Sequence, residues 1–459
     1  MEPWKRPLAH KHSMFINLHI RQVCSFMKGI ILLLTILLPL YLQAQKLVPV
    51  GEGWANNSVN VTVFRKNSLV THGRTQYIAY YSDDAFLVLG KRKLNSSNWE
   101  LLKTQYQGNA SDAHNSISLM VDGNGYLHVS WDHHGHPLRY AKSVKPNSLV
   151  LGKKTEMTGL NETNVTYPEF FKMPDGNLIF MYRDGSSGRG NMVINRYDYR
   201  TQKWQQVQQN LISGEDKRNA YWQAVVDGKG VIHVSWVWRE SWLVETNHDM
   251  CYARSTDGGR TWENSKGEKY DLPITAQTAE YACLIPQNSE LINQTSMAVD
   301  DKGNPYIASY WSPCESNIPQ YHIIYRDANG WHTECLGFRT QAFSLKGGGT
   351  KRIPIARPQL TVVQKKNQTS LCLIFRDEER GSIISAAHCA DLNNPSWEIE
   401  ELTGFQVGAW EPSFDTELWR QKRKLHLFVQ NTEQVDGEGK ANVHPEMVYV
   451  LELPHKWKN

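Results

Sequence analysis

The sequence predicts an all-β protein that folds as a seven-bladed β-propeller. Residues 121–131 (VDGNGYLHVSW) place a DGNG turn before alternating apolar and polar residues, which is the pattern of a β-hairpin. Residues 226–236 (VDGKGVIHVSW) match this segment at eight of eleven positions, and weaker copies occupy 173–182 and 299–311. Hairpins that recur at a long period are typical of propellers, in which each repeat forms one blade.

The spacing of the repeats indicates the number of blades. Each copy has an aspartate at its turn: Asp122, Asp175, Asp227 and Asp300. Successive aspartates lie 53, 52 and 73 residues apart. The 415 residues after position 44, at about 59 residues per blade, give seven blades, with six blades and insertions as the alternative. We expect Trp131 and Trp236 at corresponding strand positions of two blades.

A second kind of turn also marks a repeat of β-strands. Residues 255–262 (STDGGRTW) fit the pattern S-x-D-x-G-x-x-W. Asp257 and Gly259 suit a tight turn, and Trp262 is expected to pack between strands, so the meaning of the motif is structural. Since no stretch rich in Pro, Ser or Gly resembles a linker, residues 45–459 are expected to form a single propeller domain with a ligand pocket on its axis.

Composition excludes several classes of protein. Apolar residues make up 40% of the chain and charged residues 21%, which excludes disordered, collagen-like and coiled-coil proteins. Lys and Arg number 50 against 46 Asp and Glu, a balance that argues against nucleic-acid binding through a basic surface. The 16 tryptophans suit both a β-rich core and a carbohydrate-binding surface.

The N-terminus has the pattern of a signal peptide, assigned to residues 1–44. Ile30–Leu42 is an apolar run of 13 residues after Lys28, with a cleavage site expected near Ala44. A membrane anchor is the alternative, although the run is short for a bilayer span. We therefore expect a periplasmic or secreted protein that has no membrane contact after processing and is a monomer.

Cysteine and histidine patterns do not indicate a metal enzyme. No CxxC or HExxH motif is present, and no cofactor is required. His133, His134 and His136 lie close in sequence, but successive strand residues face opposite sides, so the metal assignment is none, with a structural ion left open. Cys372 and Cys389 could pair across neighbouring strands, although the sequence does not fix the connectivity.

Side chains suited to proton transfer gather between residues 110 and 240. His114 and His134 flank one hairpin, whereas Tyr167 precedes and Arg183 follows the next. Strand ends of consecutive blades therefore present histidine and tyrosine, which can act as acids or bases, beside a fixed cation. The competing explanation is that these residues, taken singly, pack the blades.

The same residues carry a family resemblance. The run DAHNSISLMVDGNGYLHVSWDHHGHPLRYAKS at 112–143, with TYPEFF, YRDGSSGRGN and the turn at 255–262, resembles the BNR-repeat (Asp-box) propeller family. This family includes ulvan lyases and related rhamnose–glucuronate-cleaving enzymes. The similarity extends over about residues 50–450 and is strongest over 110–240. It implies β-elimination at a uronic acid, in which a His and a Tyr act beside an Arg.

The resemblance carries over onto four residues, and the polar groups at neighbouring strand ends add four more. The catalytic group would be His114, Tyr167, His134 and Arg183. The substrate-binding group would be Asn115, Tyr221, Arg239 and Trp238. Arg183 would pair with the uronate carboxylate, His114 would be the principal base and Tyr167 the acid, or acid and base together. His134 and Asn115 would position these groups.

The function expected from the sequence is an exported polysaccharide lyase that cleaves a uronate-containing polysaccharide or oligosaccharide. A glycoside hydrolase acting on a glucuronate-linked sugar and a non-catalytic glycan-binding propeller are the alternatives. The hydrolase-like relatives would have a histidine near the start of the propeller, where this chain has Asn56 and Asn57, which speaks against that activity. The turn at 255–262 marks a fold rather than an activity, so a sialidase is not indicated.

Overall fold

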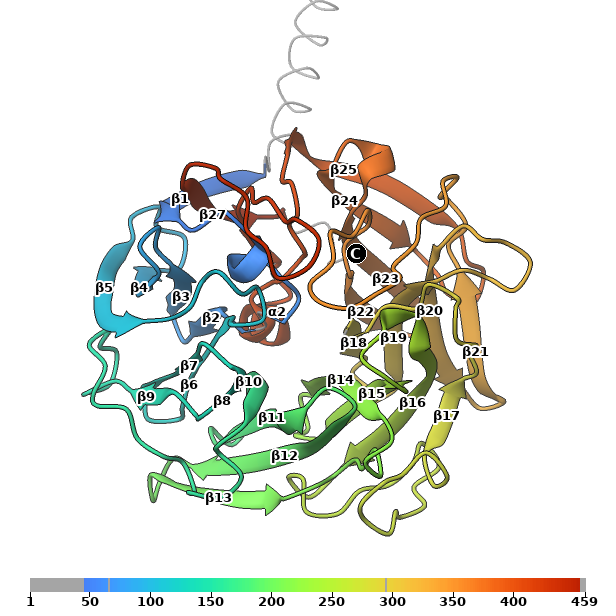
Figure 1. The fold of residues 1–459 in the computed structure, drawn as a ribbon, viewed down its shortest axis with the longest axis horizontal. Helices are drawn as coiled ribbons and strands as arrows, with labels where there is room; N and C mark the ends of the chain where they lie inside the picture. The colour runs from blue at the N-terminus through green and yellow to red at the C-terminus, as the bar shows by residue number, and fades with distance from the viewer. Residues whose placement is uncertain (1–44, 65–66, 294, 455–459) are drawn as a thin grey trace, which may run out of the picture.

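Antiparallel sheets surround a central axis, and this arrangement confirms the predicted all-β, seven-bladed propeller (Figure 1). The computed structural model describes residues 45–64, 67–293 and 295–454. The proposed signal peptide, residues 1–44, lies outside the described residues, so export stays a prediction. Within the described residues, no helix is long and apolar enough to cross a membrane.

The blades follow one another along the chain. The first complete blade contains β2 (Leu69–His72), β3 (Thr75–Tyr81), β4 (Phe86–Lys93) and β5 (Glu100–Gln107). The next contains β6 (Ile117–Val121), β7 (Leu127–Trp131) and β9 (Tyr140–Lys142). The third contains β10 (Val165–Lys172), β11 (Leu178–Ser186), β12 (Arg189–Asp198) and β13 (Lys203–Gln208), with β8 (His134–His136) paired to β10.

The remaining blades repeat this order. The fourth contains β14 (Asn219–Val226), β15 (Ile232–Arg239), β16 (Asn247–Ser255) and β17 (Glu280–Cys283). The fifth contains β18 (Ser296–Val299), β19 (Pro305–Trp311), β20 (Gln320–Asp327) and β21 (Gly330–Cys335). The sixth contains β22 (Gln359–Lys365), β23 (Gln368–Arg376), β24 (Ile383–Cys389) and β25 (Trp397–Gln406).

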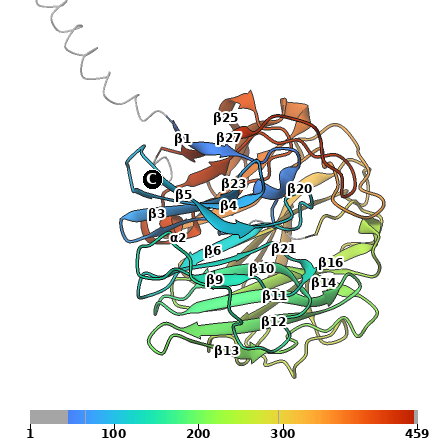
Figure 2. The same cartoon turned by 60° about the vertical axis from the view of Figure 1, so that its left-hand side comes forward.

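The two ends of the described chain close the ring in the seventh sheet. Its strands are β1 (Lys46–Gly53), β27 (Glu446–Glu452) and β26 (His426–Val429). β1 pairs antiparallel with β27, and the two strands lie side by side in both views (Figures 1 and 2). This pairing removes the open sheet edges that an unclosed ring would leave. The helix α2 (Thr416–Lys422) lies beside the axis.

The repeated aspartates occupy equivalent turns, as the sequence predicts. Asp122, Asp175, Asp227 and Asp300 each lie between the first and second strands of a blade. The Asp122 Oδ1 atom accepts hydrogen bonds from two backbone N–H groups of its turn, at 2.8 and 2.9 Å, and Asp227 does the same at 2.8 Å. The aspartate therefore stabilises each turn by replacing a backbone acceptor.

The tryptophans that follow two of these turns occupy corresponding strand positions in their blades. Trp131 lies on β7 opposite Ile117, and Trp236 lies on β15 opposite Trp222, each on the second strand of its blade. Both indoles are buried in the core between blades. The turn at 255–262 joins β16 to β17, and the Nε1 atom of buried Trp262 donates to the Gly259 carbonyl at 3.0 Å.

Cys372 and Cys389 lie on the neighbouring strands β23 and β24, but they do not form the disulfide that the sequence left open. The register pairs Cys372 with His388 and Leu371 with Cys389, so the two thiols are one residue out of alignment. Both are buried free thiols.

Candidate active site

An axial pocket of about 790 Å³ brings together six of the eight residues that the sequence singled out. They are His114, His134, Tyr167, Arg183, Tyr221 and Arg239. Tyr167 and Tyr221 lie near the starts of β10 and β14, whereas Arg183 and Arg239 lie near the ends of β11 and β15. Because these strands are antiparallel, first-strand starts and second-strand ends meet at the same end of the propeller.

The other two residues do not reach the pocket. Trp238 has no exposed surface and packs almost at right angles to Trp236, with ring centroids 5.9 Å apart. The structure does not bring Trp238 to the pocket, because its side of β15 faces the core between blades. Asn115 is also fully buried, and its Nδ2 atom donates to the Asn109 carbonyl at 3.0 Å. Asn115 thus supports the loop that carries His114.

Asp112 holds the two histidines together. Its Oδ1 atom lies 2.9 Å from His114 Nδ1, and its Oδ2 atom lies 2.7 Å from His134 Nδ1. The two imidazole rings stack with centroids 4.0 Å apart. These contacts fix the direction of both rings, so each turns its Nδ1 edge toward Asp112.

Burial alone would lower the pKa of His114, but hydrogen bonds with Asp112 and Glu438 raise it to about 9. The Glu438 Oε2 atom lies 3.5 Å from His114 Nδ1. The ring is therefore a cation at neutral pH, which disagrees with its predicted role as a neutral base.

Asp112, His114 and His134 also form a group with metal-ligand chemistry, whose ligand atoms lie within 4.8 Å of one another. The Nδ1 atom of each histidine is hydrogen-bonded to Asp112. These hydrogen bonds hold the three side chains together.

Tyr167 has a strained backbone. Its φ angle is +55°, in the left-handed region that non-glycine residues rarely adopt, and the β10–β11 register shifts between Thr166 and Glu169. This bulge places the Tyr167 ring in the pocket, 5.9 Å from the His114 ring and 6.0 Å from the Tyr221 ring. Strain of this kind is common at functional sites. Burial raises the pKa of Tyr167, so its hydroxyl stays protonated at neutral pH.

Two arginines face the two tyrosines. The Arg183 guanidinium lies 5.0 Å from the Tyr167 ring centroid, and the Arg239 guanidinium lies 5.3 Å from that of Tyr221. Although Arg183 is only 3% exposed, its Nε and Nη1 atoms have no hydrogen-bond partner among the described residues. By contrast, Arg357 in the same pocket is paired with Glu411 at 2.6 Å. Arg183 thus has free donors for an anion.

A glycine permits the position of Arg183. A Cβ atom at Gly190 would lie 2.5 Å from the Arg183 side chain, closer than such atoms approach in proteins. Gly190, in the GRGN segment, therefore lets the aliphatic part of the Arg183 side chain pack closely against the backbone.

The environment of Tyr221 differs from that of Tyr167. Its hydroxyl lies 3.2 Å from the Ser187 hydroxyl. Burial alone would raise the pKa of Tyr221, but the nearby charges of Arg239 and Arg183 lower it to about 8. The pocket therefore holds one tyrosine that loses its proton readily and one that keeps it. Two titratable groups whose pKa values are shifted apart within one pocket are typical of a catalytic acid and a catalytic base.

Protein stability is expected to fall as the pH rises through about 9, because His114 then loses its charge beside Asp112 and Glu438. The pKa of this group rises from 6.5 to about 9 on folding, so its stabilising contribution is complete below pH 6.5 and is lost through about pH 9. Urea unfolding of the wild type and of His114→Gln across this pH range measures the loss of unfolding free energy. The loss of unfolding free energy should be smaller in the variant, and parallel losses would contradict the assignment.

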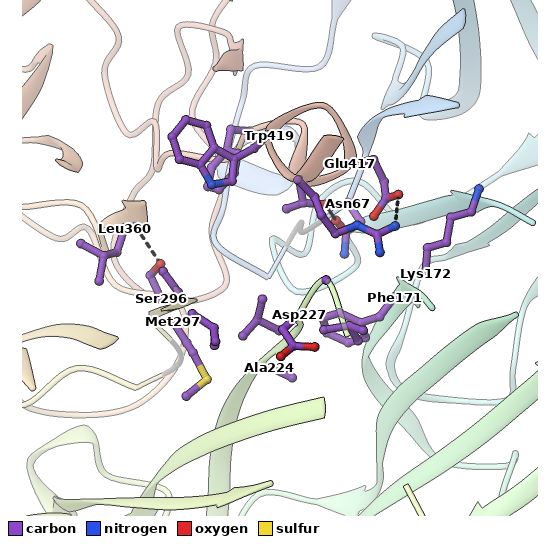
Figure 3. A pocket seen from close by; sticks show the side chains of 18 of the residues that line it. Asn67, Phe171, Lys172, Ala224, Asp227, Ser296, Met297, Leu360, Glu417 and Trp419 are labelled. Carbon is purple, nitrogen blue, oxygen red and sulfur yellow. Dashed lines mark hydrogen bonds and ion pairs between the residues drawn. The ribbon is translucent and has the colours of Figure 1, made fainter. Parts of the chain in front are cut away.

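A second cavity lies at the opposite end of the blades, beside α2 (Figure 3). Its walls include Phe171, Met297 and Trp419, and none of the eight predicted site residues lines it. Glu417 and Arg420, which also line it, pair with each other at 2.6 Å.

Several residues of the pocket were not predicted. Phe64, Arg357 and Glu438 come from parts of the chain far from residues 110–240, and no local pattern marks them. Asp112, which contacts both histidines, is visible in the sequence as the first residue of the DAHN run, two residues before His114. Trp242 follows the WRE segment of β15 and lines the same pocket.

Known proteins resemble this chain. A family model described as BNR repeat-containing family member matches residues 75–339, more than half of the chain. An ulvan lyase, long isoform, from Alteromonas sp is 26% identical over 272 residues, which cover 47% of this chain and 27% of that protein. The matched segment thus spans about a quarter of that relative's length.

Solved structures share the fold. A structure of a PL25 ulvan lyase has a TM-score of 0.63 and 15% identity, covering 89% of this chain and 93% of that one. Another, bound to GlcA(1-4)Rha3S, has a TM-score of 0.62 and 15% identity, covering 80% of this chain and 89% of that one. At this identity the likeness establishes the propeller fold.

Proposed function

The chain belongs to the BNR repeat-containing family, and we propose that it is a polysaccharide lyase that cleaves a uronate-containing glycan by β-elimination. The observation that carries the proposal is the buried guanidinium of Arg183, which has unpartnered donors beside Tyr167. A uronate carboxylate would satisfy these donors. The resemblance to ulvan lyases, one of them solved with a glucuronate–rhamnose sulfate ligand, supports this substrate class.

The first chemical requirement is to make the C5 proton of the uronate acidic. In the proposed complex, Arg183 binds the carboxylate through two N–H groups and stabilises the enolate-like charge that forms when C5 loses its proton. The imidazolium of His114 adds a second positive charge in the same pocket. Both charges act in a largely buried site, where they are less screened than in water.

Two proton transfers complete the elimination. The Tyr221 phenolate takes the C5 proton, the C4–O4 bond breaks, and the Tyr167 hydroxyl protonates the departing O4. The electron pair of the C5–H bond becomes the C4=C5 double bond. This assignment replaces His114 as base, because its neighbours keep it protonated, whereas the Arg239 charge favours the Tyr221 phenolate. His134 and Asp112 position the His114 ring.

The pH dependence of the reaction tests the choice of base. With Tyr221 as base, kcat/KM is expected to rise with pH through about 8. Tyr221→Phe should lose about 10²–10⁴-fold in kcat, since general-base catalysis contributes that much. Initial rates across the pH range measure both effects. A rise centred near the usual histidine pKa of about 6.5, and retained in Tyr221→Phe, would return the role to a histidine.

The pocket is less suited to the alternatives. Glycoside hydrolysis ordinarily uses two carboxyl groups on opposite sides of the scissile bond. Among the described residues that line the pocket, Glu438 alone has a carboxylate, and it lies beside His114. A binding module would not need two tyrosines with divergent proton affinities.

The direct test is the product. Incubation of the purified chain with ulvan and with other uronate glycans should generate the ultraviolet absorbance of an unsaturated uronate. Reducing-end release without that absorbance would indicate a hydrolase. Glycan binding with neither signal would indicate a binding module.

A further inference from the structure

Trp242 is an exposed aromatic residue at the pocket. Its side chain is 64% exposed, whereas the neighbouring Trp236 and Trp238 are fully buried. Among the described residues, no other tryptophan is classed as exposed. Trp242 also lines the pocket that holds Tyr221 and Arg239. An indole left in water beside a polar pocket has an apolar face available to a ligand.

The loop around Trp242 is ordered by its own hydrogen bonds. Arg239 Nη2 donates to the Trp242 carbonyl, and the Ser241 Oγ atom accepts from the Leu243 N–H at 3.1 Å. Val244 N–H then donates to the Gly347 carbonyl at 3.0 Å, which ties the loop to the segment that follows β21. The indole is therefore presented on an organised loop, so binding would cost little ordering entropy.

The indole also packs against a backbone. A Cβ atom at Gly348 would lie 2.4 Å from the Trp242 Cε3 atom. Glycine at this position therefore lets the ring lie flat against the neighbouring segment. Any side chain there would displace the indole, which provides a way to move the ring without removing it.

Trp242 lines the same pocket as a row of three rings. The His114 ring lies 5.9 Å from Tyr167, and Tyr167 lies 6.0 Å from Tyr221. Arg239 then contacts the Tyr221 ring at 5.3 Å and the Trp242 carbonyl. Trp242 therefore follows the arginine that faces Tyr221, and it lines the pocket in which these two residues lie.

We propose that Trp242 is a stacking platform for a sugar ring adjacent to the uronate that reacts, so that the pocket recognises a glycan chain rather than a single uronate. The inference rests on the proposed function. A pyranose has an apolar C–H face that suits a flat indole, whereas its hydroxyl groups stay in water at the pocket mouth. The platform contributes binding along the chain and no proton transfer.

Steady-state kinetics on ulvan oligosaccharides of increasing length test the platform. For Trp242→Ala, the KM is expected to rise about tenfold on the longer oligosaccharides and less on the shortest, with a smaller change in kcat. Trp242→Phe should recover most of the lost affinity, because it retains a flat apolar face. Gly348→Ala should produce a similar but smaller rise in KM, because it displaces the ring. Leu284→Ala, which removes an exposed side chain outside the pocket lining, is the matched control.

Two outcomes separate failure of the platform from failure of the proposed function. If the wild type neither cleaves nor binds oligosaccharides of ulvan or of the other uronate glycans by calorimetry, the proposed function fails and the platform with it. If the wild type cleaves them but Trp242→Ala has an unchanged KM at every length, the platform alone is wrong. An equal loss of kcat at every length would also overturn it, because that result would indicate a disturbed Arg239 rather than a lost sugar contact.

Discussion

Replacing Tyr167 with phenylalanine is expected to lower kcat by about 10²–10⁴-fold while leaving Tm within a few degrees of the wild type. The substitution removes only the hydroxyl that protonates the departing O4, and it keeps the ring contacts with His114 and Tyr221. The strained backbone at φ +55° belongs to the β10–β11 bulge, so it does not depend on that hydroxyl. Single-turnover rates and thermal melting, measured together, give the result.

Tyr182→Phe is the matched control for this experiment. Tyr182 lies on the neighbouring strand β11, is fully buried in the core, and donates to the Leu160 carbonyl at 3.3 Å. Loss of that hydroxyl should lower stability by about 1 kcal/mol and leave kcat unchanged. If Tyr167→Phe behaved like Tyr182→Phe, its hydroxyl would be structural and the lyase mechanism would lose its acid.

The repeated turns explain why the blade architecture could be predicted. Asp122 and Asp227 act locally, each through hydrogen bonds within one turn, so a short sequence pattern carries the information. Ring closure is different, because the pairing of Lys46 with Glu452 joins residues from opposite ends of the chain. β8 likewise pairs with β10 of the next blade, with Thr166 opposite His134. No local pattern encodes these non-local contacts.

The site was predicted in its position but not in its chemistry. The hairpin pattern was sufficient to place Arg183 at the end of a second strand and Tyr221 at the start of a first strand, which lie at one end of the propeller. Proton affinities depend instead on partners that only folding brings close, such as Glu438 beside His114 and Arg239 beside Tyr221. The sequence alone therefore could not indicate that Asp112 and Glu438 raise the pKa of His114.

Trp238 shows a second limit of the sequence. It lies one residue before Arg239 on β15, and in a strand adjacent side chains face opposite sides. Arg239 lines the pocket, so Trp238 packs in the core, where it contacts Trp236. The exposed indole is that of Trp242, three residues after Arg239 in a loop that strand alternation does not describe.

Replacing Arg183 should reduce catalysis severely and, for one variant, raise stability. Arg183→Lys keeps a positive charge but loses the planar pair of donors, so kcat/KM is expected to fall by about 10²-fold or more. Arg183→Met also removes the charge, and the loss of kcat/KM should be larger.

The same variant tests stability. Because Arg183 buries donors that have no partner among the described residues, its replacement by an apolar chain of similar length relieves a desolvation cost. Urea unfolding of Arg183→Met should therefore show equal or greater stability.

Arg357→Met provides the opposite case within the same pocket. Arg357 pairs with buried Glu411 through its Nε and Nη2 atoms at 2.7 and 2.6 Å. Its removal would leave the Glu411 carboxylate buried without its cation, which costs about 3–5 kcal/mol. If Arg183 is functional and Arg357 is structural, replacing each by methionine should therefore change the unfolding free energy in opposite directions. If Arg183→Met lost stability as Arg357→Met does, Arg183 would be a structural residue, and the pocket would lack its free cation for a uronate carboxylate.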